Sequence, residues 1–193
     1  ANRRGVLGEH GLSFHVRRGD AAMLFDTGQS PLLAANARAL GIELGSGDPH
    51  ERFRWFLAAV LYGARISEAL ATRTWRELDA NGIATPSAIV QAGWDRMVAR
   101  LDAGGYVRYD YKTATKLIEV CRTLQRDYGG NLDTLHAAAG GPRDLETRLQ
   151  ALGKGIGATT VGIFLRELRG IWENADPPLA PLAAVAAREL GYL

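Results

Sequence analysis

Residues 149–161 read LQALGKGIGATTV, and the interpretation of the whole chain starts from this stretch. One helical apolar pattern ends near Leu152, and another begins at Ala158. Gly155 and Gly157 lie between them, where the absence of a Cβ permits a tight turn or a close approach to a ligand. The free N–H groups and the positive dipole end at the start of the second helix can hold a phosphate. We therefore predict two short helices joined by a glycine-lined bend.

The side chains around this bend suit contact with a phosphate backbone. Lys154 supplies a positive charge, and Thr159 and Thr160 supply hydroxyl donors. Ile156 can fill the apolar gap between the two helices. A plain tight turn between two core helices would also explain the pair of glycines, but the flanking residues favour phosphate binding.

Residues 49–193 have a helical pattern throughout. Apolar side chains recur at spacings of three and four residues, first from Phe53 to Leu61 and again from Leu117 to Leu124. Glycines separate these stretches, and together the signals predict about nine helices between residues 49 and 191. Cys121 is expected to be a small buried apolar residue. The tryptophans are expected to anchor the core: Trp55, Trp75, Trp94 and Trp172.

The first 45 residues have a different pattern. Residues 12–17 alternate apolar and polar side chains, as in a half-buried strand, and residues 21–25 form a short apolar run after a turn. Residues 31–40 predict a helix, with Ser30 as its N-cap and a proline at its first position. The predicted fold class is therefore mainly α, with a β-hairpin and a helix preceding the helical domain.

Composition excludes several classes of protein. The 193 residues are 47% hydrophobic and 23% charged, which is typical of a globular chain. The single cysteine excludes disulfides within the chain and cysteine-rich metal sites. No apolar run approaches the roughly 18 residues of a membrane span, and the first residues lack the apolar segment of a signal peptide. A reducing, cytoplasmic location without a membrane partner is expected.

The formal net charge is only +2, so any affinity for nucleic acid must come from a local patch. Residues 96–126 contain seven basic and three acidic side chains, interleaved with Tyr106, Tyr109 and Tyr111. Cations beside aromatic rings suit a surface that follows a phosphate backbone and stacks on bases. A solvated helix face with tyrosines at its entry is the alternative interpretation.

Residues 49–193 resemble the helix-hairpin-helix superfamily of DNA glycosylases, the endonuclease III-like group. The LxxLxxGIGxxT pattern that ends at Thr160 matches the hairpin of that family. Residues 104–106, 116–124 and 128–132 resemble the helix and glycine-rich turn before it, and residues 56–67 resemble an early helix and its loop. The order of these segments along the chain supports the resemblance more strongly than the hairpin alone.

The resemblance implies roles for particular residues. Asp176 occupies the place of the aspartate that assists departure of the damaged base, although a carboxylate at a helix start is also an ordinary N-terminal cap. Family members extrude the target base and fill the gap with a wedge. Tyr106 or Tyr109 is the candidate wedge, and Arg65 is the candidate for the opposite side of the gap. The DNA-binding set implied is Lys154, Gly155, Ile156, Gly157, Thr159, Thr160, Tyr106, Arg108, Tyr109, Lys112 and Arg65.

Two departures from the family pattern define the expected chemistry. Bifunctional members carry a Schiff-base lysine where this chain has Thr159, so a lyase step through an amine is not expected. The cysteines that bind the endonuclease III cluster are absent, so no iron–sulfur cluster, other cofactor or metal is expected. A monovalent cation at the hairpin stays an open alternative.

Residues 8–14 and 24–30 resemble the opening strands of metallo-β-lactamase-fold hydrolases. The metal-binding histidine cluster of that family does not follow them, and the four histidines are scattered along the chain. We therefore expect residues 1–45 to be a remnant of that fold without its hydrolase chemistry.

The sequence thus predicts a protein that binds double-stranded DNA. The first hypothesis is a monofunctional DNA N-glycosylase of base-excision repair, with Asp176 as its catalytic carboxylate. The alternative is a helix-hairpin-helix module that holds DNA without cutting it. The sequence does not determine which base would be released or the oligomeric state.

Overall fold

The chain forms a mainly helical structure, as predicted. The computed structural model describes residues 13–18, 21–26, 37–179, 184–185 and 188–189. In chain order the helical elements are η1 (Leu44–Ser46), α2 (Pro49–Tyr62), α3 (Glu68–Ala80), α4 (Pro86–Ala103), α5 (Asp110–Tyr128), α6 (Leu132–Ala137), α7 (Pro142–Ala151) and α8 (Ala158–Arg166). Most of the helix predicted near residues 179–190 falls outside the described residues.

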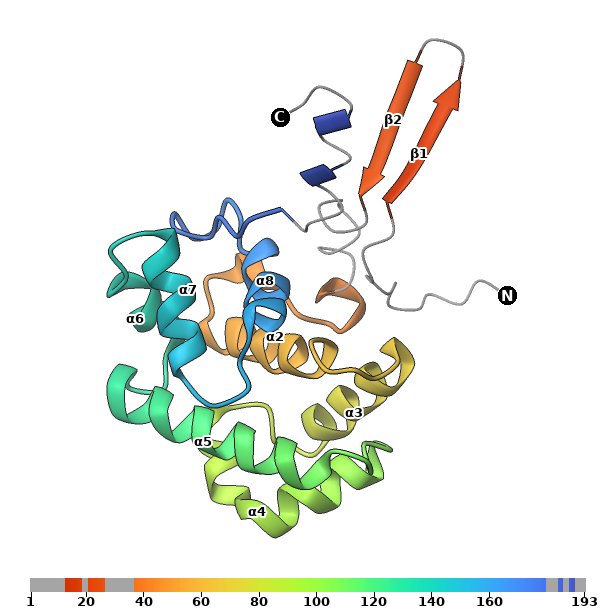
Figure 1. Cartoon of the computed structure of the whole chain (residues 1–193). Helices are drawn as coiled ribbons and strands as arrows, with labels where there is room; N and C mark the ends of the chain where they lie inside the picture. Colours follow the sequence, from red (N-terminus) through yellow and green to blue (C-terminus); the bar gives the residue numbers. More distant parts are fainter. Residues whose placement is uncertain (1–12, 19–20, 27–36, 180–183, 186–187, 190–193) are drawn as a thin grey trace.

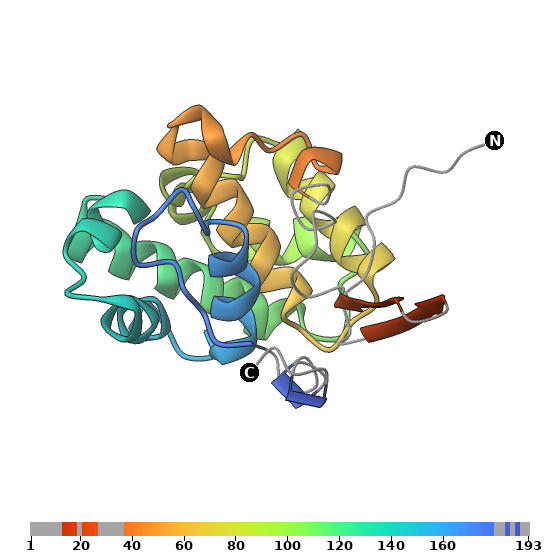
Figure 2. The same ribbon diagram turned by 90° about the horizontal axis from the view of Figure 1, so that it is seen from above.

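Helix α2 runs through the middle of the helical body, with the other helices around it (Figure 1 and Figure 2). Seven consecutive side chains, from Trp55 to Leu61, are at most 1% exposed. Because seven residues of a helix point in every direction around its axis, α2 must be covered on all sides. The sequence periodicity predicted only one buried face for this helix, and the structure shows that its flanks are buried as well.

Aromatic side chains connect α2 to the end of the described chain. Phe56 meets Phe164 of α8 edge-to-face, with ring centroids 5.2 Å apart, and Phe164 meets Trp172 in the same way at 5.5 Å. The indole N–H of Trp172 donates to a carboxylate oxygen of Asp133 in α6, and Arg52 of α2 lies 3.0 Å from the same oxygen. These contacts hold α2, α6 and α8 together and so position the start of α8.

Helices α4 and α5 lie side by side at one edge of the helical body, and α5 also contacts α6 (Figure 1). The predicted apolar stripe of α5 is buried, including Leu117, Val120 and Leu124, which confirms its amphipathic pattern. Cys121 is also buried, and burial raises the pKa of its thiol to about 12. A thiol with so high a pKa is not a nucleophile near neutral pH.

Three of the four tryptophans are core residues, and one is not. Trp55, Trp75 and Trp172 are at most 5% exposed, as predicted. The prediction for Trp94 is wrong, because this side chain is 43% exposed. It follows Gly93, whose φ of 72° interrupts the helical backbone of α4, and its ring lies against Tyr111 of α5. The non-helical backbone at Gly93 therefore directs the side chain of Trp94 away from the core.

Near the N-terminus, strands β1 (Ser13–Arg18) and β2 (Ala21–Asp26) are antiparallel, and Ser13 is opposite Asp26 in the register. Residues 19 and 20 between the strands lie outside the described residues, so the hairpin stays a prediction. Of the helix predicted over residues 31–40, the described part contains a short helical turn over residues 37–39.

The close approach of α2 to α8 generates a stability prediction. A Cβ at Gly63 would lie 2.5 Å from Oγ1 and 3.2 Å from Cα of Thr160. We expect Gly63→Ala to lower the free energy of unfolding by about 1–3 kcal/mol, because the two helix ends must separate. Gly162→Ala is the matched control, since its Cβ would meet nothing within 4 Å and alanine favours the helix. Urea unfolding measures both, and equal stabilities for the two variants would contradict the prediction.

Candidate nucleic-acid interface

The predicted bend joins α7 to α8. Gly155 has φ of +91°, a left-handed conformation that favours glycine, whereas Gly157 has an extended backbone and is the N-cap of α8. Ile156 between them is 5% exposed and packs into the core, as predicted. The buried isoleucine fixes the bend and leaves both glycines at the surface.

The backbone amides at this bend are available to a ligand. Gly155, Gly157, Ala158 and Thr159 are exposed, and their N–H groups have no acceptor among the described residues. No side chain caps α8. The first N–H groups of a helix have no partner within the helix and normally receive one from a capping side chain or from water. The start of α8 is therefore a row of unpaired donors at the positive end of the helix dipole.

Other helices of the chain begin differently. Helices α2, α4 and α7 have a proline in the first turn, which removes one free N–H. Side chains of Asp48, Ser67, Thr85 and Asn131 cap α2, α3, α4 and α6. Helices α5 and α8 have neither device. In α5 the carboxylate of Asp110 accepts from the N–H of Tyr111, whereas no side chain of the described residues accepts from the first N–H groups of α8.

Two lysines flank the bend. Lys154 is exposed on it, as predicted. Lys116 of α5 is half-buried, and its Cδ lies 3.5 Å from the position that a Cβ of Gly155 would take. Neither ammonium group has a carboxylate partner among the residues described. Burial lowers the pKa of Lys116 below the ordinary value of 10.5, so its charge is held in a partly desolvated place.

Lys116 is absent from the residues predicted for the site. A signal was nevertheless present, because Lys112 and Lys116 are four residues apart and therefore lie on one side of α5. Arg108 and Lys112 are exposed and, in the described part of the chain, have no ion pair. Arg100 and Arg126 of the same basic segment instead pair with Glu77 and Asp127.

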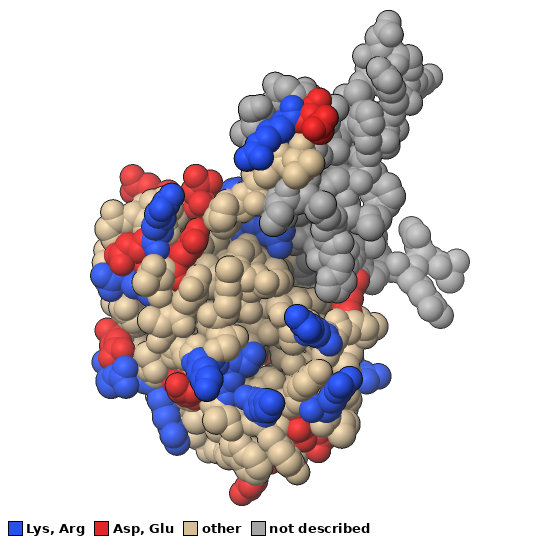
Figure 3. Space-filling model, in the orientation of Figure 1, with Lys and Arg blue, Asp and Glu red and all other residues tan. Residues whose placement is uncertain are grey.

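The distribution of charged side chains on the surface agrees with the position of these unpaired basic residues. Figure 3 shows lysine and arginine side chains gathered over the bend between α7 and α8 and over α5, with few acidic groups among them. The opposite end of the same face, near α6 and α7, mixes acidic and basic groups. Basic side chains therefore gather on the face of the molecule that carries the row of free amides.

The structure brings Arg65 to the same region. Gly63 packs directly against Thr160 near the start of α8, and Arg65 is exposed two residues further along this loop. The side chain of Thr160 is 4% exposed because it is enclosed by this contact. The predicted hydroxyl donor at Thr160 is therefore unavailable to a phosphate, whereas Thr159 is exposed.

Tyr106 is not the predicted wedge. Its side chain is 3% exposed, and the hydroxyl of Thr113 donates to its phenol oxygen at 3.4 Å. Tyr109 is half-buried, and the guanidinium of Arg108 lies over its ring at 5.4 Å. The turn is fixed because Gly104 packs tightly on Thr74 of α3. Burial of the first ring therefore leaves Tyr109 as the surviving wedge candidate of the pair.

Asp176, the predicted catalytic carboxylate, is exposed and borders a hollow in the surface. Its side chain is 78% exposed, and one carboxylate oxygen lies 3.6 Å from a guanidinium nitrogen of Arg169. It borders a wide, open hollow of about 1040 Å³ whose other walls come mainly from residues 140–150. Glu146 of α7 is part of that wall. The hollow that Asp176 borders is lined by neither Tyr106 nor Tyr109.

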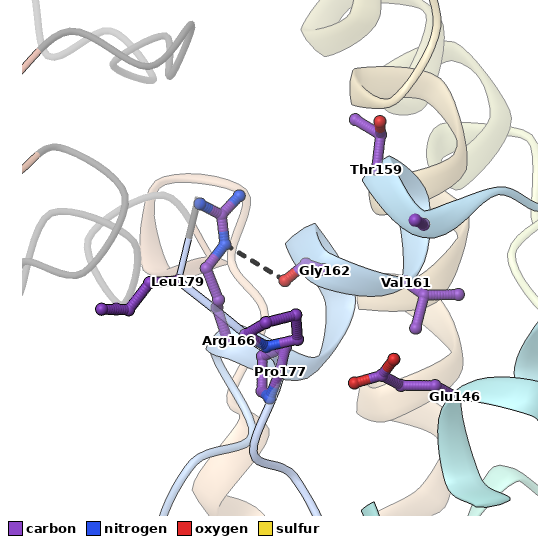
Figure 4. Close-up of a pocket in the computed structure, with 9 residues that line it drawn as sticks. Glu146, Thr159, Val161, Gly162, Arg166, Pro177 and Leu179 are labelled. Atoms are coloured by element: carbon purple, nitrogen blue, oxygen red, sulfur yellow. Dashed lines mark hydrogen bonds between the residues drawn. The ribbon is translucent and has the colours of Figure 1, made fainter. Parts of the chain in front are cut away.

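A smaller hollow of about 300 Å³ lies between α7, α8 and residues 177–179. Figure 4 shows the carboxylate of Glu146 pointing toward Pro177, with Thr159 at one end. Arg166 lies on the far side, where its Nε donates to the carbonyl oxygen of Gly162 at 3.1 Å. Glu146 borders both hollows, one of which reaches the start of α8 and the other Asp176. Nothing in the local sequence distinguishes it from an ordinary helix-surface glutamate.

No protein-family model, curated protein sequence or solved structure matches the chain. Among the described residues, no helix combines the length and apolar character needed to cross a membrane. In that same part of the chain, no group of three or more histidine, cysteine, aspartate and glutamate side chains is arranged to hold a metal ion.

The half-buried charge of Lys116 generates a prediction about stability. Because its folded pKa is lowered, the charged form destabilises the folded state at neutral pH, and this effect fades as pH rises through the folded pKa. We expect Lys116→Met to raise the melting temperature at neutral pH and the gain to shrink toward pH 10.5. Thermal unfolding at several pH values measures this. A lower melting temperature than wild type at neutral pH would contradict it.

Proposed function

We propose that the chain binds the sugar–phosphate backbone of double-stranded DNA through the bend between α7 and α8. The observation that carries this proposal is the row of exposed, unpaired amides at Gly155 and residues 157–159. Such amides are ordinary phosphate ligands at a helix start. Lys154 and Lys116 lie next to Gly155, where they would neutralise the phosphate charge.

The surrounding cations extend the binding surface. Arg65 lies beyond the start of α8, Lys112 lies on α5, and Arg108 lies in the turn before that helix. Each phosphate that these groups neutralise releases counterions, so affinity should fall steeply with salt concentration. With a formal net charge of only +2, binding depends on this local patch and not on the whole surface.

The fold that accompanies this function is also proposed. Residues 49–193 would form a helix-hairpin-helix domain like that of the endonuclease III-like glycosylases, which is supported by the glycine bend and its buried Ile156. Residues 1–45 would be a β-hairpin and helix of metallo-β-lactamase type; the antiparallel register of β1 and β2 supports the hairpin, and the sequence resemblance supports the type.

A proline substitution tests the amide row directly. Ala158 is the first residue of α8, where proline is tolerated, and Gly157 before it is already extended. We expect Ala158→Pro to remove one donor and weaken duplex binding about tenfold, since a hydrogen bond to a charged group contributes about 1.5–3 kcal/mol. Fluorescence anisotropy with a labelled blunt duplex measures the change.

Ala158→Ser is the matched control, because it alters the same position and keeps the N–H group. Both variants should unfold at temperatures close to that of wild type, since proline at this position suits the helix. Equal DNA affinity for Ala158→Pro and wild type, or wild-type affinity that does not respond to salt, would overturn the proposed binding site.

A second function is proposed for Asp176, namely monofunctional DNA N-glycosylase activity. It is favoured by the position of this carboxylate on a hollow whose Glu146 wall also borders the start of α8. A base extruded from a duplex held at the bend could enter from that side. The carboxylate would stabilise positive charge on the sugar as the N-glycosidic bond breaks, and water would supply the hydroxyl group to the sugar and a proton to the base.

We expect Asp176→Asn to abolish base release from lesion-containing duplexes and to leave duplex affinity within about twofold, because the neutral amide cannot stabilise a cationic sugar. Glu173→Gln is the control, as it removes an exposed carboxylate nearby. A panel of damaged and mispaired duplexes, resolved after alkaline cleavage, provides the assay. Base release by Asp176→Asn at the wild-type rate would eliminate the assignment, and a wild-type chain inactive on the whole panel would favour the binding-module alternative.

A further inference from the structure

Two aromatic rings lie together on the surface where α4 meets α5. Trp94 is 43% exposed and Tyr111 is 60% exposed, and their ring centroids are 5.1 Å apart. Large apolar side chains are normally covered in a folded protein, so a paired and exposed tryptophan and tyrosine indicate a binding surface.

The position of these rings is fixed by the chain. The indole N–H of Trp94 donates to the hydroxyl of Thr115 at 3.1 Å, and that hydroxyl donates to the carbonyl oxygen of Tyr111 at 2.8 Å. The left-handed backbone at Gly93 places Trp94 outside the core. Because the rings are held in advance, a ligand would lose little side-chain entropy in ordering them.

The chemistry beside the rings favours an anionic partner. Arg108 and Lys112 flank Tyr111 in the sequence, are exposed and have no carboxylate partner among the described residues. An apolar protein partner would have to desolvate these charges, whereas a nucleic acid strand neutralises them with phosphates and stacks its bases on the rings.

Helix α5 connects these rings to the glycine bend. Lys116, which borders the bend at Gly155, is five residues from Tyr111, or on the order of 7.5 Å along the helix axis. Lys112 lies between them. Figure 1 shows α5 between the bend and α4, so a strand leaving a duplex at the bend could cross α5 to reach the rings.

We propose that Trp94 and Tyr111 form a stacking platform for unpaired bases, and that the chain therefore prefers DNA in which a duplex continues into a single strand. The preference rests on the proposed duplex binding at the bend. The occupant is single-stranded DNA, recognised by base stacking without sequence readout, because every base has a face that can stack.

The test compares a blunt duplex with the same duplex carrying an oligo(dT) extension at its 3′ or its 5′ end, and with oligo(dT) alone. We expect one of the two extensions to tighten binding roughly fivefold or more, the lower end of the effect of stacking one base. Trp94 should report contact by fluorescence quenching, since Trp55, Trp75 and Trp172 are buried.

Two substitutions isolate the aromatic ring. Trp94→Phe and Trp94→Leu both remove the indole N–H and its bond to Thr115, but only phenylalanine keeps a ring. Trp94→Phe should retain most of the affinity gained from the extension but lose the fluorescence quenching. Trp94→Leu should lose that gain in affinity and bind the blunt duplex as wild type does. Circular dichroism checks that both variants are folded.

The outcomes separate the two proposals. If wild type binds the blunt duplex but gains nothing from either extension, or if Trp94→Leu keeps the gain, the platform is overturned and the duplex site stands. If blunt duplex does not bind while oligo(dT) quenches Trp94, the platform stands and the proposed duplex function fails. If Trp94→Leu changes only self-association in sedimentation velocity, the rings serve a protein interface and the platform is overturned.

Discussion

A helix that is apolar in every direction is stable in water only when other helices surround it, and α2 imposes this constraint on the chain. The side chains from Trp55 to Leu61 are all buried, so the remaining helices must enclose them. Helix α8 is placed by this requirement through the contacts of Phe56 with Phe164 and of Gly63 with Thr160. The position of the glycine bend at the surface follows from the packing of the core.

The bend shows how a binding surface can be built at some cost to stability. Prolines or capping side chains occupy the starts of α2, α3, α4, α6 and α7, but α8 begins with unpaired amides. Lys116 is half-buried beside them, and its lowered pKa shows that its charge is held in an unfavourable place. Groups of this kind are typical of functional sites, where local stability is given up for interactions with a ligand.

The two edges of α5 border different parts of the structure. One edge of the helix borders the bend through Lys116 and Val120, and the other edge borders α4 through Tyr111 and Thr115. The buried stripe of α5 fixes the directions of both edges, because the residues of a helix cannot rotate independently. A single amphipathic helix therefore connects two surfaces that are far apart in the sequence.

The sequence by itself determined the mainly helical fold, the bend with its buried Ile156, and the burial of Cys121 and of three tryptophans. These features depend on local signals, namely apolar periodicity, glycine conformational freedom and the volume of apolar side chains. The four-residue spacing of Lys112 and Lys116 also indicated that they share one side of a helix, although only the contact with Gly155 shows which of these lysines borders the bend.

Only the tertiary structure decided which side chains are accessible. Tyr106 and Thr160 are buried because Thr113 of α5 and Gly63 at the end of α2 pack against them, and Trp94 is exposed because the backbone turns at Gly93. Glu146 borders two hollows because α7, α8 and the segment after Trp172 come together there. Accessibility is set by neighbours distant in the chain, and the pattern around a residue records its helix face but not what covers that face.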